Sequence, residues 1–135
     1  MIQPRADADQ LREDKQELAF LQRIEKRLPE DTEVLRALGD LYTRTGATAE
    51  GLRVDERLSH LCGDDPLVWY NLACSFSLSK RNDEALDALS RAMDLGYDDY
   101  EWMKKDSDLS GLHGDSRFES MLDWIYNTFE QVPEN

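Results

Sequence analysis

Two stretches of the sequence decide the fold: LRALGDLYTRTG at residues 35–46 and WYNLACSFSLSK at residues 69–80. They align with an offset of 34 residues, which places Leu35, Leu38, Gly39 and Tyr42 opposite Trp69, Leu72, Ala73 and Phe76. In both stretches two large residues, a small one and an aromatic one follow at steps of three, one and three, so they share one face of a helix. A fixed period of this length predicts a repeat fold in which neighbouring units stack to bury a common core.

A second helical pattern follows each stretch. In the second unit small and bulky residues alternate at Ala85, Leu89 and Ala92. In the first unit Gly51 and Leu58 fill the equivalent places, but Asp55 stands where a bulky apolar residue is expected. A buried aspartate needs a polar partner and a solvated one does not, so both arrangements remain open for Asp55. We expect four helices of similar length over residues 31–96, with breaks near Gly46, Gly63 and Arg81-Asn82.

The 34-residue period and its pattern of large and small residues resemble the tetratricopeptide repeat (TPR), a helix-turn-helix unit. The resemblance implies an all-α fold, a TPR stack that forms a single domain over residues 1–135. It implies an N-terminal capping helix at about residues 6–28, repeats at 32–65 and 66–99, and a C-terminal helical cap at 100–131. The closing segment, from Gly96-Tyr97 to Arg117-Phe118, looks like that of many small bacterial TPR proteins.

Both caps have their own apolar patterns. A stripe at helical spacing marks the N-terminal helix and consists of Leu11, Leu18, Leu21, Ile24 and Leu28. After Gly96, short apolar contacts between Asp, Ser and Gly predict brief helical turns before a final helix. Ser116 and Glu119 could form a capping box there, followed by an apolar face of Phe118, Met121, Leu122, Ile125 and Phe129. Apolar surroundings at helical spacing also predict that Trp69, Trp102 and Trp124 pack in the core or between helices, with an exposed anchor for a partner as the alternative.

The net charge of −13 limits the kind of partner. Residues 94–135 contain three basic and eleven acidic side chains and so carry −8 of it. Nucleic acids and anionic membranes would be repelled, whereas a basic protein or peptide would be attracted. The polar start of the chain and the lack of a long apolar run predict a cytoplasmic protein. Cys62 and Cys74, the only two cysteines, are expected to be reduced thiols.

We expect no catalytic residue, no metal site and no cofactor. The segment from Asp106 to Gly111 begins like a calcium-binding loop, but its twelfth place holds Arg117 where two more oxygens are needed. His60 and His113 lack a zinc-motif neighbour, and there is no glycine-rich phosphate loop or nucleophile elbow. Asp and Ser in this segment are expected to cap helical turns.

Two surfaces are candidates for partner binding. The TPR resemblance implies a peptide-binding groove on the first helix of each repeat, whose non-core positions are Glu33, Arg36, Asp40, Arg44, Leu67, Tyr70, Asn71, Cys74 and Ser77. The second candidate is the acidic C-terminal face, represented by Asp98, Asp99 and Glu101. Either surface could instead be an ordinary solvated helix face.

The function expected from the sequence is a protein-protein interaction module that binds a polypeptide through the groove or through the acidic face. Two alternatives remain open at this point. The first is a chaperone for a specific unfolded or secreted client. The second is a structural subunit that assembles as a homodimer through its exposed end helices.

Overall fold

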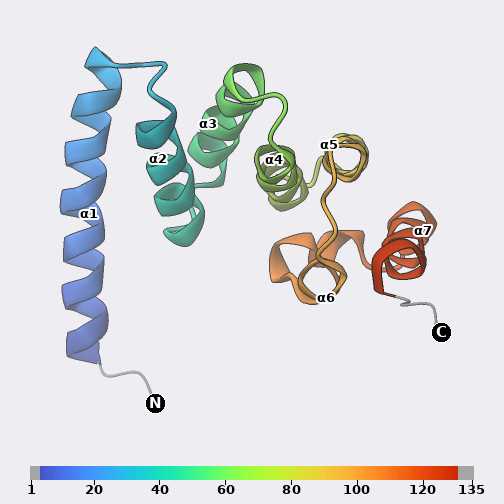
Figure 1. The fold of residues 1–135 in the computed structure, drawn as a ribbon. Coiled ribbons are helices and arrows are strands. Elements are labelled where there is room, and N and C mark those ends of the chain that lie inside the picture. Colours follow the sequence, from blue (N-terminus) through green and yellow to red (C-terminus); the bar gives the residue numbers. More distant parts are fainter. Residues whose placement is uncertain (1–3, 131–135) are drawn as a thin grey trace. The chain divides into compact units, whose positions relative to one another are not determined.

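The computed structural model describes residues 4–130 and contains helices and no strand over that range (Figure 1). The predicted all-α fold is therefore confirmed. The chain divides into two compact units, one up to Leu61 and the other from Cys62 onward. No helix in the described range is both long enough and apolar enough to cross a membrane.

Unit 1 contains three consecutive helices: α1 (Pro4–Arg27), α2 (Thr32–Arg44) and α3 (Thr48–Leu61). α2 begins where Asp31 accepts hydrogen bonds from the backbone N–H groups of Glu33 and Val34, at 3.0 and 3.1 Å. α2 packs against α3, and α1 packs against α2. The repeat residues supply the core of this unit, which includes Leu35, Leu38, Leu41, Tyr42, Val54 and Leu58.

The apolar stripe expected on α1 is not buried as a whole. Leu11 and Leu28 are 51% and 52% exposed, whereas Leu18, Leu21 and Ile24 are half-buried. α1 has 24 residues and α2 has 13, so α1 is about 36 Å long against about 20 Å for α2. One helix this short cannot cover the apolar face of a helix nearly twice its length.

Unit 2 begins with α4 (Pro66–Leu78) and α5 (Asn82–Asp94), which lie side by side (Figure 1). Asp65 caps α4, and Pro66 occupies the first helical position, where its fixed φ suits a helix start. Four short elements follow: α6 (Tyr100–Lys105), the 3-10 helix η1 (Ser107–Leu112), α7 (Ser116–Ile125) and the π-helical turn η2 (Tyr126–Glu130). η1 packs on α4, and α7 contacts α5 and α6.

The four predicted repeat helices are confirmed, because α2 to α5 have 13 or 14 residues each and break at the predicted places. The brief turns before a final helix are also confirmed. The capping box at Ser116 is wrong as predicted: Asp115 caps α7 by accepting from the N–H of Arg117 at 2.9 Å. Glu119 does reach back, but it accepts from Gly114 at 3.4 Å.

The tryptophans also differ from the prediction. Trp102 and Trp124 are each 48% exposed, so the expectation that they pack inside is wrong. Trp69 is half-buried, and its indole N–H donates to the carbonyl of Gly63 at 2.9 Å. Spacing alone could not distinguish these positions, because a tryptophan on the rim of a small core has the same helical period as one inside it.

Asp55 is buried in α3, with 5% of its surface exposed, and this residue takes part in a polar or electrostatic interaction. A Cβ added at Gly39 of α2 would lie 3.0 Å from Oδ1 of Asp55, so a larger residue there would require this carboxylate to shift by a few tenths of an ångström. Of the two arrangements left open by the sequence, the buried one with a partner is present. The small residue of the repeat pattern thus accommodates the one charged residue that breaks the pattern.

We predict that Asp55→Leu lowers the free energy of unfolding by about 1 to 3 kcal/mol, because the buried partner of the carboxylate is left unsatisfied. Urea denaturation followed by circular dichroism measures the change. The matched control is Asp40→Leu, at an exposed site on α2, which should stay within about 0.5 kcal/mol of the parent chain. An equal or higher stability for Asp55→Leu would contradict the buried arrangement.

Candidate functional site

The groove face predicted on α4 is largely covered by the chain itself. Tyr70, Cys74 and Ser77 are 4%, 7% and 6% exposed, and η1 packs on the helix that carries them. A Cβ added at Gly111 of η1 would lie 3.8 Å from Oγ of Ser77, which shows how closely the two segments approach. These three side chains cannot reach a partner in this structure, whereas Leu67 and Asn71 on the same helix are exposed.

The contact between α4 and η1 centres on the buried carboxylate of Asp106, which is 6% exposed. The Tyr70 hydroxyl donates to its Oδ2 at 2.6 Å, and the Cys74 thiol donates to the same atom at 3.7 Å. The other oxygen, Oδ1, accepts from the backbone N–H of Asp108 at 3.0 Å and caps η1. One carboxylate therefore starts the 3-10 helix and holds it on α4.

Aromatic packing completes this buried cluster. The rings of Tyr70 and Tyr97 stack with centroids 4.4 Å apart and an interplanar angle of 8°. Burial raises the pKa of the Tyr70 and Tyr97 phenols well above the ordinary value of a tyrosine. The nearby Cys74 and Asp106 raise the pKa of Tyr70 further. Burial also raises the pKa of Asp108, with a further contribution from the negative charge of Asp106.

Cys74, Asp106 and Asp108 are also the residues here that could hold a metal ion, since their ligand atoms lie within 4.8 Å of one another. A thiolate and two carboxylates could ligate zinc. Both oxygens of Asp106 already accept hydrogen bonds, however, and these bonds fix η1 in place. We therefore assign the cluster to the packing of η1 on α4.

The groove residues predicted on α2 lie in unit 1, and Glu33, Arg36, Asp40 and Arg44 are all exposed. A guanidinium nitrogen of Arg44 lies 3.7 Å from the Asp14 carboxylate of α1, which makes an ion pair. Arg36 also takes part in an interaction within the structure. The acidic C-terminal residues Asp98, Asp99 and Glu101 are exposed in unit 2. Asp99 has a structural task as well, because it caps α6 by accepting from the N–H of Trp102 at 3.1 Å.

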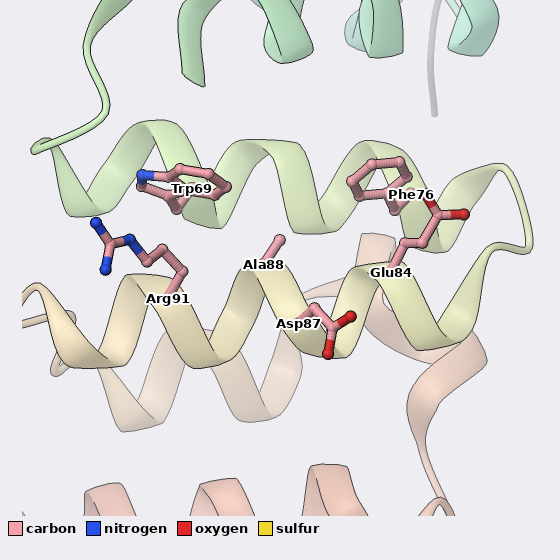
Figure 2. A pocket seen from close by; sticks show the side chains of 6 residues that line it. All are labelled: Trp69, Phe76, Glu84, Asp87, Ala88 and Arg91. Carbon is pink, nitrogen blue, oxygen red and sulfur yellow. The ribbon is translucent and has the colours of Figure 1, made fainter. Parts of the chain in front are cut away.

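Unit 2 also contains an open pocket that the sequence analysis did not single out. Figure 2 shows Trp69 and Phe76 on α4, two turns apart, with α5 running alongside and Ala88 between the two rings. The pocket has a volume of about 300 Å³ and is lined by Trp69, Phe76, Glu84, Asp87, Ala88 and Arg91. Two aromatic walls and a small residue between them form a recess for an apolar group.

Charged side chains surround this recess. The Arg91 guanidinium lies 5.9 Å from the ring centre of Trp69, and that of Arg81 lies 4.8 Å from Phe76. Arg81 also forms a two-pronged ion pair with Glu84, at 2.7 and 2.6 Å. Asp87 is exposed and lines the pocket next to Ala88, so a carboxylate lies at its rim.

The repeat pattern identified Trp69 and Phe76 as packing residues, and it gave no sign that they also line a pocket. The sequence feature that could have indicated the pocket is on α5. There Glu84, Asp87 and Arg91 lie at helical spacing around the small residue Ala88.

A scan against models of protein families finds no match for this chain, and a search of curated protein sequences likewise finds none. Any function must therefore be argued from the site itself.

We predict that Tyr70→Phe lowers the free energy of unfolding by about 1 to 3 kcal/mol at pH 7, because Asp106 loses its shortest hydrogen bond while it stays buried. Chemical denaturation of the full chain measures the loss. Tyr126→Phe, at a ring that is 43% exposed, is the control and should change little. Equal losses for the two variants would mean that the hydrogen bond to Asp106 contributes nothing.

The same cluster predicts a dependence of stability on alkaline pH. An unfolded tyrosine ionises near pH 10.0, whereas folded Tyr70 and Tyr97 keep their protons to higher pH. The unfolded chain therefore releases protons first, and the free energy of unfolding should fall as the pH rises above about 10. Tyr70→Phe removes one of these groups, so its stability should fall less steeply between about pH 10 and 11 than that of the parent chain. Parallel curves would rule out this source of alkaline instability.

Proposed function

We propose that this chain is a non-catalytic TPR-type module that binds a polypeptide, and that the pocket between Trp69 and Phe76 receives an apolar side chain of the partner. The observation that carries the proposal is the contrast between two faces of unit 2. The polar face of α4 is buried under η1, while the pocket beside α5 is open and has aromatic walls. The proposal includes the cytoplasmic location expected from the sequence.

The size of the pocket favours one side chain over a whole small molecule. A recess of about 300 Å³ lies at the lower end of the range for ligand sites, and it is open to solvent. Partner helices and extended peptides typically insert one or a few apolar anchors between aromatic residues in this way. A leucine, methionine or phenylalanine side chain would mainly contact the half-buried Trp69, and it would reach only the small exposed parts of Phe76 and Ala88, which are 8% and 3% exposed where they line the pocket.

The rim favours a basic residue next to that anchor. Arg81 already neutralises Glu84, and Arg91 lies over Trp69, so Asp87 is the rim carboxylate best placed to meet a partner's lysine or arginine. The unit as a whole, residues 62–135, has six basic and sixteen acidic side chains. A net charge of −10 would steer a basic segment toward this surface.

The experiment is a selection of peptides from a random phage-displayed library on the immobilised full chain. Enriched peptides should share one large apolar residue with lysine or arginine nearby. Their affinity should fall at least about tenfold on Ala88→Leu, which fills the recess, and severalfold on Asp87→Lys, which reverses the rim charge. Circular dichroism of each variant checks that the helices are intact.

Two control variants address the other candidate surfaces. One changes Asp98, Asp99 and Glu101 to Asn, Asn and Gln, and the other changes Arg36 and Asp40 to Ala. Neither should weaken the selected peptides by more than about twofold. Peptides that bind Ala88→Leu and Asp87→Lys as well as they bind the parent chain would refute the pocket, and loss on a control would assign binding to the acidic face or to α2.

A further inference from the structure

Both ends of the chain expose large apolar side chains where a helical repeat protein usually has a polar outer surface. On α1 these are Leu11, Phe20 and, just beyond its end, Leu28, each more than half exposed. In the C-terminal elements they are Trp124, Tyr126 and Phe129, exposed by 48%, 43% and 43%.

The exposed surface at the N-terminal end combines an exposed aromatic residue with basic neighbours. Phe20, Ile24 and Leu28 follow at steps of four and line a shallow groove of about 430 Å³ together with Arg23 and Arg27. Residues 20–29 contain three basic side chains and one acidic side chain, in a chain whose net charge is −13. The acidic one, Glu25, is already paired with Arg53 at 2.9 Å. Arg23 and Arg27 therefore give this apolar surface a positive charge.

The C-terminal end has a recess with the opposite charge. α5 and α7 enclose a groove of about 360 Å³ lined by Ser90, Met93, Asp94, Ser120, Met121 and Trp124. Methionine and tryptophan form its apolar wall. The rings of Trp124 and Phe129 pack in a T-shaped arrangement with their centroids 5.9 Å apart. Asp94 supplies a carboxylate at the rim, and the serines leave space for an incoming side chain. Methionine adapts readily to the shape of an aromatic guest.

We propose that the α1 surface of one copy docks head-to-tail into the α5–α7 groove of a second copy. Phe20 enters the groove against Met93, Met121 and Trp124, while Arg23 and Arg27 meet Asp94. A head-to-tail contact uses two different surfaces, so each copy keeps one free surface and can bind a further copy.

Charge favours this pairing over the two symmetric ones. An α1–α1 contact would bring Arg23 and Arg27 against their own copies, and a groove–groove contact would bring Asp94 against Asp94. Like charges opposed at an interface reduce affinity, whereas opposite charges fix the register and speed association. The contact is separate from the Trp69–Phe76 pocket, and self-association does not depend on the proposed peptide binding.

The first test is analytical ultracentrifugation of the full chain over a range of concentrations. The weight-average mass should rise from the 15.6 kDa of a single chain as concentration increases. Phe20→Gln removes the inserted ring, and Ser120→Arg fills the groove and repels Arg23 and Arg27. Each should weaken self-association by about ten- to a hundredfold. Leu67→Gln, at an apolar residue that is 56% exposed elsewhere, is the matched control and should associate like the parent chain.

Mixing the two variants tests the head-to-tail geometry. Phe20→Gln keeps an intact groove and Ser120→Arg keeps an intact α1, so one wild-type contact can form between them. Each variant alone should sediment as a monomer, and the equimolar mixture should give a dimer and nothing larger. A wild-type chain that stays monomeric would overturn the proposal, and so would association that survives in Ser120→Arg alone or a mixture that fails to dimerise.

Discussion

The buried carboxylate of Asp106 is the interaction on which the arrangement of unit 2 depends. It accepts hydrogen bonds from the Tyr70 hydroxyl of α4 and from the backbone N–H of Asp108 in η1, and so joins a regular helix to an irregular segment. A buried charge is stable only where polar groups surround it, so the register between α4 and η1 is confined to the one that brings Tyr70 to Asp106. The closing segment can then bury its own apolar residues, such as Met103 and Leu109, without forming a long helix.

The parts of the fold that could be predicted from the sequence are those set by periodicity. Leu35, Leu38 and Leu89 recur at helical steps, and burying such a stripe leaves little choice of partner face. The 34-residue offset therefore located four helices and their breaks. The residue that caps the start of a helix was harder to predict. At α7, Asp115 and Ser116 are both good N-cap residues, and only the path of the chain selects between them.

The candidate site was harder to predict because it depends on contacts between residues distant in sequence. Nothing local to Tyr70, Cys74 or Ser77 indicates that residues 106–112 will cover them. Trp69 and Phe76 matched the repeat pattern as core residues. Such a pattern does not distinguish a ring that is covered on both sides from a ring that also lines an open pocket. The same limit applies to Trp102 and Trp124, whose exposure follows from where the small core of unit 2 ends.

The aspartates that begin helices give the acidity of this chain a meaning beyond solubility. Five of them, Asp31, Asp65, Asp99, Asp106 and Asp115, accept backbone N–H groups at the starts of α2, α4, α6, η1 and α7. Five of the 29 acidic side chains thus serve the backbone as local counter-charges, one at the start of each of these helices. Near the sequence pI of about 4.4 the molecule loses the net negative charge that keeps copies apart. At the start of α7, by contrast, the hydrogen bond from Arg117 holds the pKa of the Asp115 carboxyl below its ordinary value, so this helix start keeps its charge to lower pH.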